Sequence, residues 1–213
     1  MQVNTHLSVN AIGNVDALSL LKNDHRIIEA LLITFAASDD RRARKTIARR
    51  LCQVITIHMA IEESILYPVA QLAITGDLVH EAEVEHFTAK VLIADIESLN
   101  VTDTRFAATV KVLGEYVRHH IKEEEHHLFP QLKRAQLDMS SLGTRLAAER
   151  MELLANAGLD DSELACVVSN AREASSHRNA AHNAALKTMP RMPKRSGGIA
   201  KRRKHKSTAS VVN

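Results

Sequence analysis

The sequence predicts an all-α protein built around an up-down-up-down four-helix bundle. Residues that favour strands or turns are scarce, with 3% aromatic residues, no Trp, 7 Gly and 4 Pro in 213 residues. Four long segments carry apolar residues at spacings of three and four, the period of an amphipathic helix. The connections between these segments are short, and short connections favour antiparallel neighbours.

The first two helices are expected from their capping residues as well as from their periodicity. Asp16 can cap the segment ALSLLKNDHRIIEALLITFA, which begins at Ala17. The stretch SDD at 38–40 then offers capping residues for a second helix, which reaches about Gln71.

The next two helices follow the same rules. In the stretch ITGD, Gly76 ends the second helix and Asp77 caps a third, which runs to about Leu99. The stretch NVTDT opens a fourth helix, which continues to about Leu137. The interpretation thus divides the chain into a flexible N-terminus at 1–15, the four-helix bundle at 16–138, a helical extension at 139–188 and a disordered basic tail at 189–213.

The extension and the tail differ from the bundle in pattern and charge. Residues 140–156 and 160–187 are expected to form two additional C-terminal helices. Ten Lys or Arg residues follow Glu173, the last acidic residue, so a basic tail follows an acidic body. The tail segment Lys194–Lys206 suits weak, salt-sensitive binding to nucleic acid or anionic lipid. A solvated tail that only aids solubility is the alternative.

The cellular compartment is predicted from what the sequence contains. No apolar run reaches the roughly 18 residues that a membrane-spanning helix needs, and the first residues do not resemble a signal peptide. Cys52 and Cys166 are too few and too far apart for a disulfide framework. We therefore expect a cytoplasmic protein, in which Cys52 is either a packed thiol or a redox partner.

A repeat in the sequence carries the functional prediction. HMAIEESILYP at 58–68 and HIKEEEHHLFP at 120–130 each have His first, Glu fifth and sixth, and then Leu, an aromatic residue and Pro. Another histidine precedes each copy, because His25 lies 33 residues before His58 and His86 lies 34 before His120. The chain therefore contains a duplicated two-helix unit.

Helix geometry separates the acidic residues of each copy. Side chains at i and i+4 differ by only about 40° around a helix axis, so they face the same point. His58 with Glu62, and His120 with Glu124, have this spacing. The sixth-position glutamates lie on the flank. The bundle then directs six side chains into one interior, namely His25, His58, Glu62, His86, His120 and Glu124.

Two carboxylates in that interior predict a metal site. A buried carboxylate without a partner costs several kcal/mol, and a cation removes that cost. Imidazole and carboxylate suit iron, manganese or zinc, and two bridging carboxylates suit a pair of ions. The alternative is that each histidine is an ordinary interior or surface imidazole and the Glu-rich run a solvated face. We assign that interpretation to His6, His80, His119, His126, His127, His177, His182 and His205.

The same segments resemble a known family. DHRIIEALL, HMAIEESILYP, EAEVEHFTAKVLIADI and HHIKEEEHHLFP are similar to the four signature segments of hemerythrin-like (HHE cation-binding) domains. The resemblance covers residues 16–135. It implies a four-helix bundle that holds two non-haem iron ions with an oxo or hydroxo bridge. It also implies that the six residues named above are the ligands, with Glu62 and Glu124 as bridges.

The sequence departs from the oxygen-carrying members at two places. Those members have a second histidine one turn from the third-helix ligand, where this chain has Ala82 and Lys90. The missing imidazole implies an open coordination position. Their last carboxylate also lies one residue later, which makes Glu125 an alternative to Glu124. Asp24 or Glu29 are candidates to orient the imidazoles.

Two functions follow from the resemblance, and a third combines it with the charge of the basic tail. The first is a di-iron protein that binds or senses O2, NO, peroxide or iron in a redox-stress response. The second is an enzyme that turns over peroxide or NO at the same centre. The third is a metal-sensing interaction protein whose basic tail contacts nucleic acid.

Overall fold

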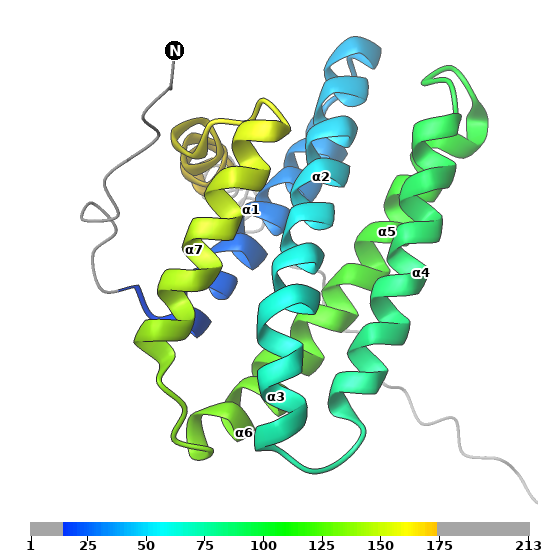
Figure 1. Cartoon of the computed structure of the whole chain (residues 1–213). Helices are drawn as coiled ribbons and strands as arrows, with labels where there is room; N and C mark the ends of the chain where they lie inside the picture. Colours follow the sequence, from blue (N-terminus) through cyan, green and yellow to red (C-terminus); the bar gives the residue numbers. More distant parts are fainter. Residues whose placement is uncertain (1–14, 174–213) are drawn as a thin grey trace, which may run out of the picture. The chain divides into compact units, whose positions relative to one another are not determined.

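A computed structural model of the chain describes residues 15–173 (Figure 1). Within these residues all regular structure is helical. Four long helical segments run up, down, up and down, which confirms the predicted all-α bundle. Residues 1–14 of the expected flexible N-terminus and the basic tail at 189–213 lie outside the described residues.

The first two helices begin at the caps that the sequence indicates. Helix α1 spans Ala17–Ala37, and the side chain of Asp16 accepts a hydrogen bond from the N–H of Ser19 at 2.8 Å. Asp40 caps helix α2, Arg41–Ile61, in the same way at 2.7 Å. Each cap satisfies a backbone N–H that the start of a helix leaves without a partner.

The second segment is not one continuous α-helix. After α2 the chain passes through a wider π-helical turn, η2, at Glu62–Leu66, and then through α3 at Tyr67–Ala73. Helix α4 follows at Leu78–Ser98. The turn before α4 contains Gly76 at φ 108°, a conformation that favours glycine.

The fourth segment repeats the form of the second. Helix α5 spans Thr104–Glu123, the π turn η3 spans Glu124–Leu128, and α6 spans Phe129–Arg134. The segment ends at Arg134 rather than at the expected Leu137. Gln136 has a φ of 55°, in the left-handed region, which interrupts the helical hydrogen bonding.

A further helix, α7, spans Met139–Asn156 and packs against α1 and α2 (Figure 1). Gly143 allows this close approach, because a β-carbon at this position would collide with the backbone oxygen of Val15. Residues 161–173 are also helical. The rest of the second extension helix, expected to reach residue 187, lies outside the described residues.

Two apolar clusters fill the bundle, one towards each end. Along α1, Leu21 belongs to one cluster and Ile28 to the other, and His25 lies between them. On α4 the same order places His86 between the clusters. The polar side chains therefore form a layer enclosed by apolar packing. None of the helices in the described part of the chain is long and apolar enough to cross a membrane.

Candidate metal centre

Both copies of the repeat widen their helix at the interior glutamate. In the first copy the N–H of Tyr67 donates to the carbonyl oxygen of Glu62, five residues earlier. In the second copy the N–H of Phe129 donates to the carbonyl oxygen of Glu124. Pro68 and Pro130 lie two residues after the last residues of these turns, Leu66 and Leu128. A proline lacks an N–H and its ring crowds the carbonyl four residues back, so the wider turn relieves that clash. The repeated proline thereby accounts for a turn type that is common at functional sites.

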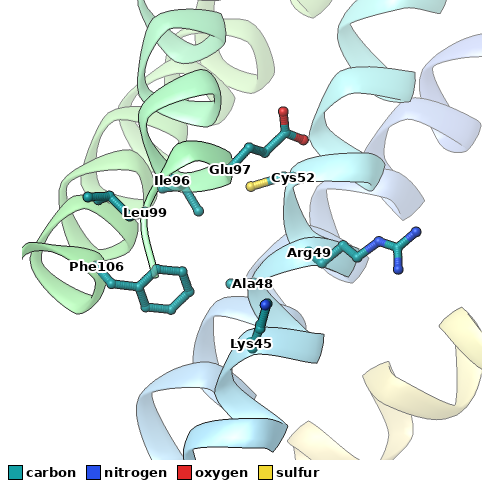
Figure 2. Close-up of a pocket in the computed structure, with 8 residues that line it drawn as sticks. All are labelled: Lys45, Ala48, Arg49, Cys52, Ile96, Glu97, Leu99 and Phe106. Atoms are coloured by element: carbon teal, nitrogen blue, oxygen red, sulfur yellow. The ribbon is translucent and has the colours of Figure 1, made fainter. Parts of the chain in front are cut away.

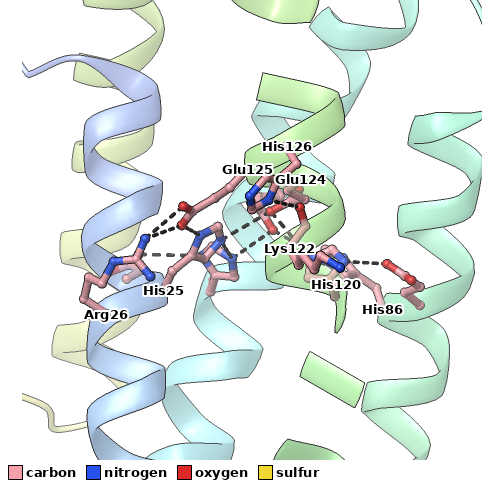
Figure 3. A network of polar contacts seen from close by, with 12 residues as sticks. His25, Arg26, His86, His120, Lys122, Glu124, Glu125 and His126 are labelled. Atoms are coloured by element: carbon pink, nitrogen blue, oxygen red, sulfur yellow. Dashed lines mark hydrogen bonds and ion pairs between the residues drawn. The ribbon is translucent and has the colours of Figure 1, made fainter. Parts of the chain in front are cut away.

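The structure brings all six predicted side chains into one buried layer, and Figure 3 labels His25, His86, His120 and Glu124 among them. Each is at most 5% exposed. The layer consists of His25 from α1, His58 from α2, Glu62 from η2, His86 from α4, His120 from α5 and Glu124 from η3. Their role as metal ligands stays a prediction, which their geometry can support or weaken.

The first histidine pair consists of His25 and His58. Their Nε2 atoms lie 3.1 Å apart. Oε2 of Glu124 lies 3.3 Å from Nε2 of His25, and Oε2 of Glu62 lies 3.3 Å from Nε2 of His58. Two imidazoles and two carboxylates therefore point their ligating atoms at one small volume.

The second histidine pair consists of His86 and His120, whose Nε2 atoms also lie 3.1 Å apart. Oε2 of Glu62 lies 3.4 Å from Nε2 of His86, and Oε2 of Glu124 lies 3.6 Å from Nε2 of His120. Each carboxylate thus faces one histidine of each pair, as a ligand that bridges two ions would.

The two interior carboxylates lack the partners that buried charges require. Burial, together with the charge of Glu124, raises the pKa of Glu62 well above its usual value. Burial also opposes ionisation of Glu124, but His120 and His25 outweigh it and lower the pKa of Glu124. Neither oxygen of Glu62 has a hydrogen-bond partner, and Oε2 of Glu124 also has none. Cations between the two pairs would satisfy these oxygens.

Two of the four imidazoles are held in the form that binds metal, whereas for His25 the carboxylates of Glu124 and Glu125 outweigh burial and raise the pKa. Burial, with the charge of His120, lowers the pKa of His86 to about 3. Burial also lowers the pKa of His58. These two rings are therefore neutral at pH 7, and a neutral imidazole has a lone pair available for a cation. The donor set fits a pair of divalent transition-metal ions.

The sixth-position glutamates cross between the two copies. Nδ1 of His25 lies 2.8 Å from Oε1 of Glu125, and Nδ1 of His86 lies 2.9 Å from Oε1 of Glu63. Each repeat therefore supports the first-helix histidine of the other copy. Figure 3 shows Glu125 reaching His25 from beside Glu124, which points into the layer instead.

The residue before each first-helix histidine faces the second-helix histidine of its own copy. Oε2 of Glu85 lies 2.8 Å from Nδ1 of His120. Oδ2 of Asp24 lies 3.9 Å from Nδ1 of His58, which is beyond hydrogen-bond range. All four imidazoles thus turn Nδ1 towards a carboxylate, the usual arrangement behind metal-bound histidines.

The carboxylates that face Nδ1 of the four histidines are called the outer carboxylates, and each has a basic neighbour. Arg26 donates to both oxygens of Glu125 at 2.8 Å, and Lys90 donates to both oxygens of Glu63 at 2.7 Å. Nε2 of the exposed His119 lies 3.5 Å from Oε1 of Glu85. Arg150, from α7, holds Asp24 through Nε and Nη2.

The aromatic residues of the repeat play unequal parts. The phenol oxygen of Tyr67 lies 3.1 Å from Nε2 of His86 and donates to Oε1 of Glu124 at 3.0 Å. Phe129, the matching residue, stacks on His25 with ring centroids 5.8 Å apart. A single hydroxyl therefore enters the layer, on the side of the second pair.

Comparison with known proteins identifies the family. The family model of the hemerythrin HHE cation binding domain matches residues 16–132. This chain belongs to the hemerythrin HHE family. No curated protein sequence matches the chain. The fold is similar to the crystal structure of a hemerythrin HHE cation-binding domain-containing protein from Mycobacterium kansasii, with a TM-score of 0.60 and 20% identity over 67% of this chain and 90% of that chain.

Several residues around this hemerythrin-like site were not identified from the sequence. Tyr67, Glu85 and Arg150 were not singled out as neighbours of the site, and Lys90 was named only as a position without a second histidine. Of the two acids considered for orienting the imidazoles, Asp24 faces His58. Glu29 pairs with Arg26 instead. The position of Glu85 directly before His86, matching Asp24 before His25, is the signal that would have found it.

The remaining histidines of this hemerythrin-like chain divide into two groups. Those within the described residues are exposed, namely His80, His119, His126 and His127. His127 pairs with Glu123 at 3.5 Å on the surface. The others, His6, His177, His182 and His205, lie outside the described residues.

Cys52 lines a separate pocket of about 200 Å³ between α2, α4 and the start of α5 (Figure 2). The pocket has an apolar floor that includes Ile96 and Phe106. Burial raises the pKa of Cys52 to about 12, so the side chain remains a thiol at neutral pH. A packed thiol is therefore the better of the two interpretations that the sequence left open.

Proposed function

We propose that this hemerythrin-family chain is a non-haem di-iron protein that binds or senses O2, NO, peroxide or iron in a redox-stress response. The unpartnered carboxylate of Glu62 carries the proposal. It is fully buried, lies against Glu124 and faces a histidine of each pair. Without a cation this arrangement is costly, whereas two cations would give every donor a partner.

The ligand assignment follows from the distances. His25 and His58 would hold one ion, and the second histidine pair would hold the other. Glu62 and Glu124 would bridge the two ions. Glu125 is the weaker candidate for a ligand, because it already contacts Nδ1 of His25 and the guanidinium of Arg26. Iron suits a bundle that presents carboxylate and imidazole from facing helices.

The chain's own residues would prepare the site for a small ligand. When bound, iron would supply the electron chemistry towards that ligand. The apolar clusters on either side keep bulk water out of the layer. Hydrogen bonds between Nδ1 and the outer glutamates hold the rings of His25, His86 and His120 in place, which leaves Nε2 directed at the interior. The second imidazole that oxygen-carrying members have one turn from the third-helix ligand is absent here, at Ala82 and Lys90, and its absence would leave room for the incoming ligand.

The decisive experiment is metal analysis of protein purified without oxygen. We expect about two irons per chain, and a charge-transfer band in the near ultraviolet after exposure to oxygen. Glu62→Gln should abolish both signals. Glu115→Gln, a change to an exposed acid on α5, should leave them intact. A wild-type chain that is fully folded, free of metal and unresponsive to added iron would refute the proposal.

Tyr67 favours a second candidate, turnover of peroxide at the same centre. Its hydroxyl donates to Oε1 of Glu124 and lies 3.1 Å from Nε2 of His86. Burial, with the charge of Glu124, raises the pKa of Tyr67 well above its usual value, so the phenol keeps its proton. This proton can be donated to a reduced oxygen atom in the layer.

Steady-state assays can distinguish turnover from binding. Tyr67→Phe should lower peroxide consumption about a hundredfold, while the iron content stays at two per chain. Equal rates in both proteins would leave the binding and sensing role as the better account.

The proposed location remains the cytoplasm, where the two free thiols, Cys52 and Cys166, would stay reduced.

A further inference from the structure

The two carboxylates that precede the first-helix histidines make different contacts. Glu85 lies 2.8 Å from Nδ1 of His120. Asp24 occupies the matching place in the first copy but lies 3.9 Å from Nδ1 of His58. That nitrogen is fully buried and has no hydrogen-bond partner. Among the four histidines of the layer, His58 therefore lacks the support that the other three receive.

Arg150 accounts for the position of Asp24. Its Nε lies 2.8 and 3.0 Å from the two carboxylate oxygens of Asp24, and its Nη2 lies 2.7 Å from Oδ1. Both side chains are buried, at 2% exposure for Asp24 and 6% for Arg150. A bidentate pair of this kind has a strong and specific geometry. The carboxylate therefore gives its best hydrogen-bonding directions to the guanidinium.

The guanidinium comes from outside the hemerythrin unit. The family match ends at residue 132, whereas Arg150 belongs to α7, which packs on α1 and α2. Asp161, in the following helical segment, holds Nη2 of Arg150 from the other side at 2.9 Å. In the second copy, the group next to Glu85 is the exposed His119.

The chemical consequence concerns the donor strength of His58. A carboxylate that accepts a hydrogen bond from Nδ1–H makes the imidazole more basic and strengthens its bond to a metal. A carboxylate that is already neutralised by a guanidinium does this less. The negative charge that Asp24 would present to a cation at the first pair is also offset by Arg150.

We infer that Arg150 is a positioning residue that draws Asp24 away from His58 and so makes the first histidine pair the weaker of two metal subsites. This inference rests on the proposed metal binding. It gives α7 a function beyond packing, because the C-terminal extension then sets the difference in affinity between two otherwise similar subsites. One ion would be held firmly and the other exchanged more readily.

The shorter side chain of Asp24 is a competing explanation, since Asp has one methylene less than Glu. Two variants separate the explanations. Arg150→Met removes the guanidinium and leaves the length of Asp24 unchanged. Asp24→Glu adds the missing length and leaves Arg150 in place. If Arg150 controls the position, the first variant should strengthen metal binding at one subsite more than the second does.

Stepwise titration of the full chain with Co²⁺, in competition with a chelator and without oxygen, would measure both affinities. We expect two unequal constants for the wild type. Arg150→Met should raise the weaker affinity about tenfold and leave the stronger one unchanged. Asp24→Asn should lower the weaker affinity. The matched control is Arg50→Gln, which breaks an exposed ion pair with Glu163 on the same C-terminal segment and should change neither constant.

A spectroscopic measurement reports on the contact itself. In protein loaded with Zn²⁺, the NMR chemical shift of the Nδ1 proton of His58 should change in Arg150→Met. It should move to the range of a strongly hydrogen-bonded proton, which the other three histidines show. A purely structural role for Arg150 would lower thermal stability without this shift. If Arg150→Met fails to fold, Arg150→Lys keeps the charge but loses the bidentate geometry, and a smaller change of the same sign is expected.

The outcomes separate this inference from the proposed function. A wild-type chain that binds no metal refutes the proposed function. Two ions bound with equal affinity, or an Arg150→Met variant whose weaker constant stays the same or falls, would overturn only the role of Arg150.

Discussion

The two copies of the duplicated unit agree in the inner layer and differ on the outside. In the first copy, Ile57 and Ile61 on α2 are buried where α7 packs against this helix. The matching residues on α5, 62 positions later, are the exposed His119 and the half-buried Glu123. The ligand positions are shared while the covered face is not. The two copies therefore share one centre, whereas α7 packs on the helices of the first copy.

The charged groups around the two histidine pairs show the same difference. The first pair has a buried cation nearby, Arg150, which is 6% exposed. Beside the second pair, Lys90 contacts Glu63, and its side chain is 48% exposed. Solvent screens an exposed charge far more than a buried one. Equal ligands can thus have unequal strengths, because their surroundings differ.

The largest expected effect comes from Glu62→Gln, which removes a ligand common to both pairs. Metal binding should fall below detection at both subsites, since a neutral amide is a poor bridging ligand. The same change should stabilise the metal-free protein by about 1–3 kcal/mol at neutral pH, because it removes a buried carboxylate without a partner. Metal analysis and chemical denaturation would measure the two effects.

The pH dependence of the unfolding free energy of the metal-free protein tests whether the buried carboxylate of Glu62 is the cause. Burial raises the pKa of Glu62 well above the usual 4.5, so the folded chain binds this proton more tightly than the unfolded chain. Stability should therefore fall as the pH rises from about 4.5 through the raised pKa, and then level off. Glu62→Gln should remove that decline. A decline of the same size in both proteins would contradict the assignment.

Glu125→Gln and Glu63→Gln test whether the crossed contacts are equivalent. Each change weakens the support of one first-helix histidine, His25 or His86, and should lower metal affinity about ten- to a hundredfold. The loss should concern a different subsite in each variant. Stepwise titration would show this, and a loss spread evenly over both subsites would mean that the two halves do not act separately.

Gly143→Ala would weaken the packing of α7 against the helices of the first copy. The added β-carbon would meet the backbone oxygen of Val15, so α7 must shift. We expect a loss of about 1–3 kcal/mol in unfolding free energy, together with faster hydrogen exchange in α7 than in α5. Met151→Ala, a change to an exposed residue of the same helix, serves as the control. Unchanged stability would show that α7 is not tightly seated.

Lys90→Met should have the smallest effect. The side chain contacts both oxygens of Glu63 but is nearly half exposed. Exposed ion pairs contribute at most about 1 kcal/mol, so metal affinity at the second pair should change by less than about fivefold. The contrast with Arg150→Met would show whether burial sets the influence of a cation on the centre. Equal effects of the two changes would contradict that view.

The sequence was sufficient for the parts of the structure that depend on local rules. Asp16 and Asp40 cap the helices at the expected positions, because capping needs only nearby backbone groups. The six interior side chains were also located from their spacing, since i and i+4 must share a helix face. Glu125 was kept as an alternative to Glu124 because the oxygen-carrying members of the family have their last carboxylate one residue later, although helix geometry favours Glu124.

The parts that the sequence could not supply depend on contacts between distant segments. Tyr67 was not recognised as a neighbour of the site, because its hydroxyl meets Glu124 only after two helices pack together. The π turns at Glu62 and Glu124 were not expected, although the prolines that accompany them were visible in the repeat.

The sequence by itself determined an all-helical chain, its duplicated unit and the residues that face the interior. These follow from the helical period and from capping, which act over a few residues. Only the tertiary structure decided which carboxylate supports which imidazole, and it brought Arg150 to Asp24 across 126 residues. Such a pairing depends on how α7 packs against α1, and no local pattern specifies that packing.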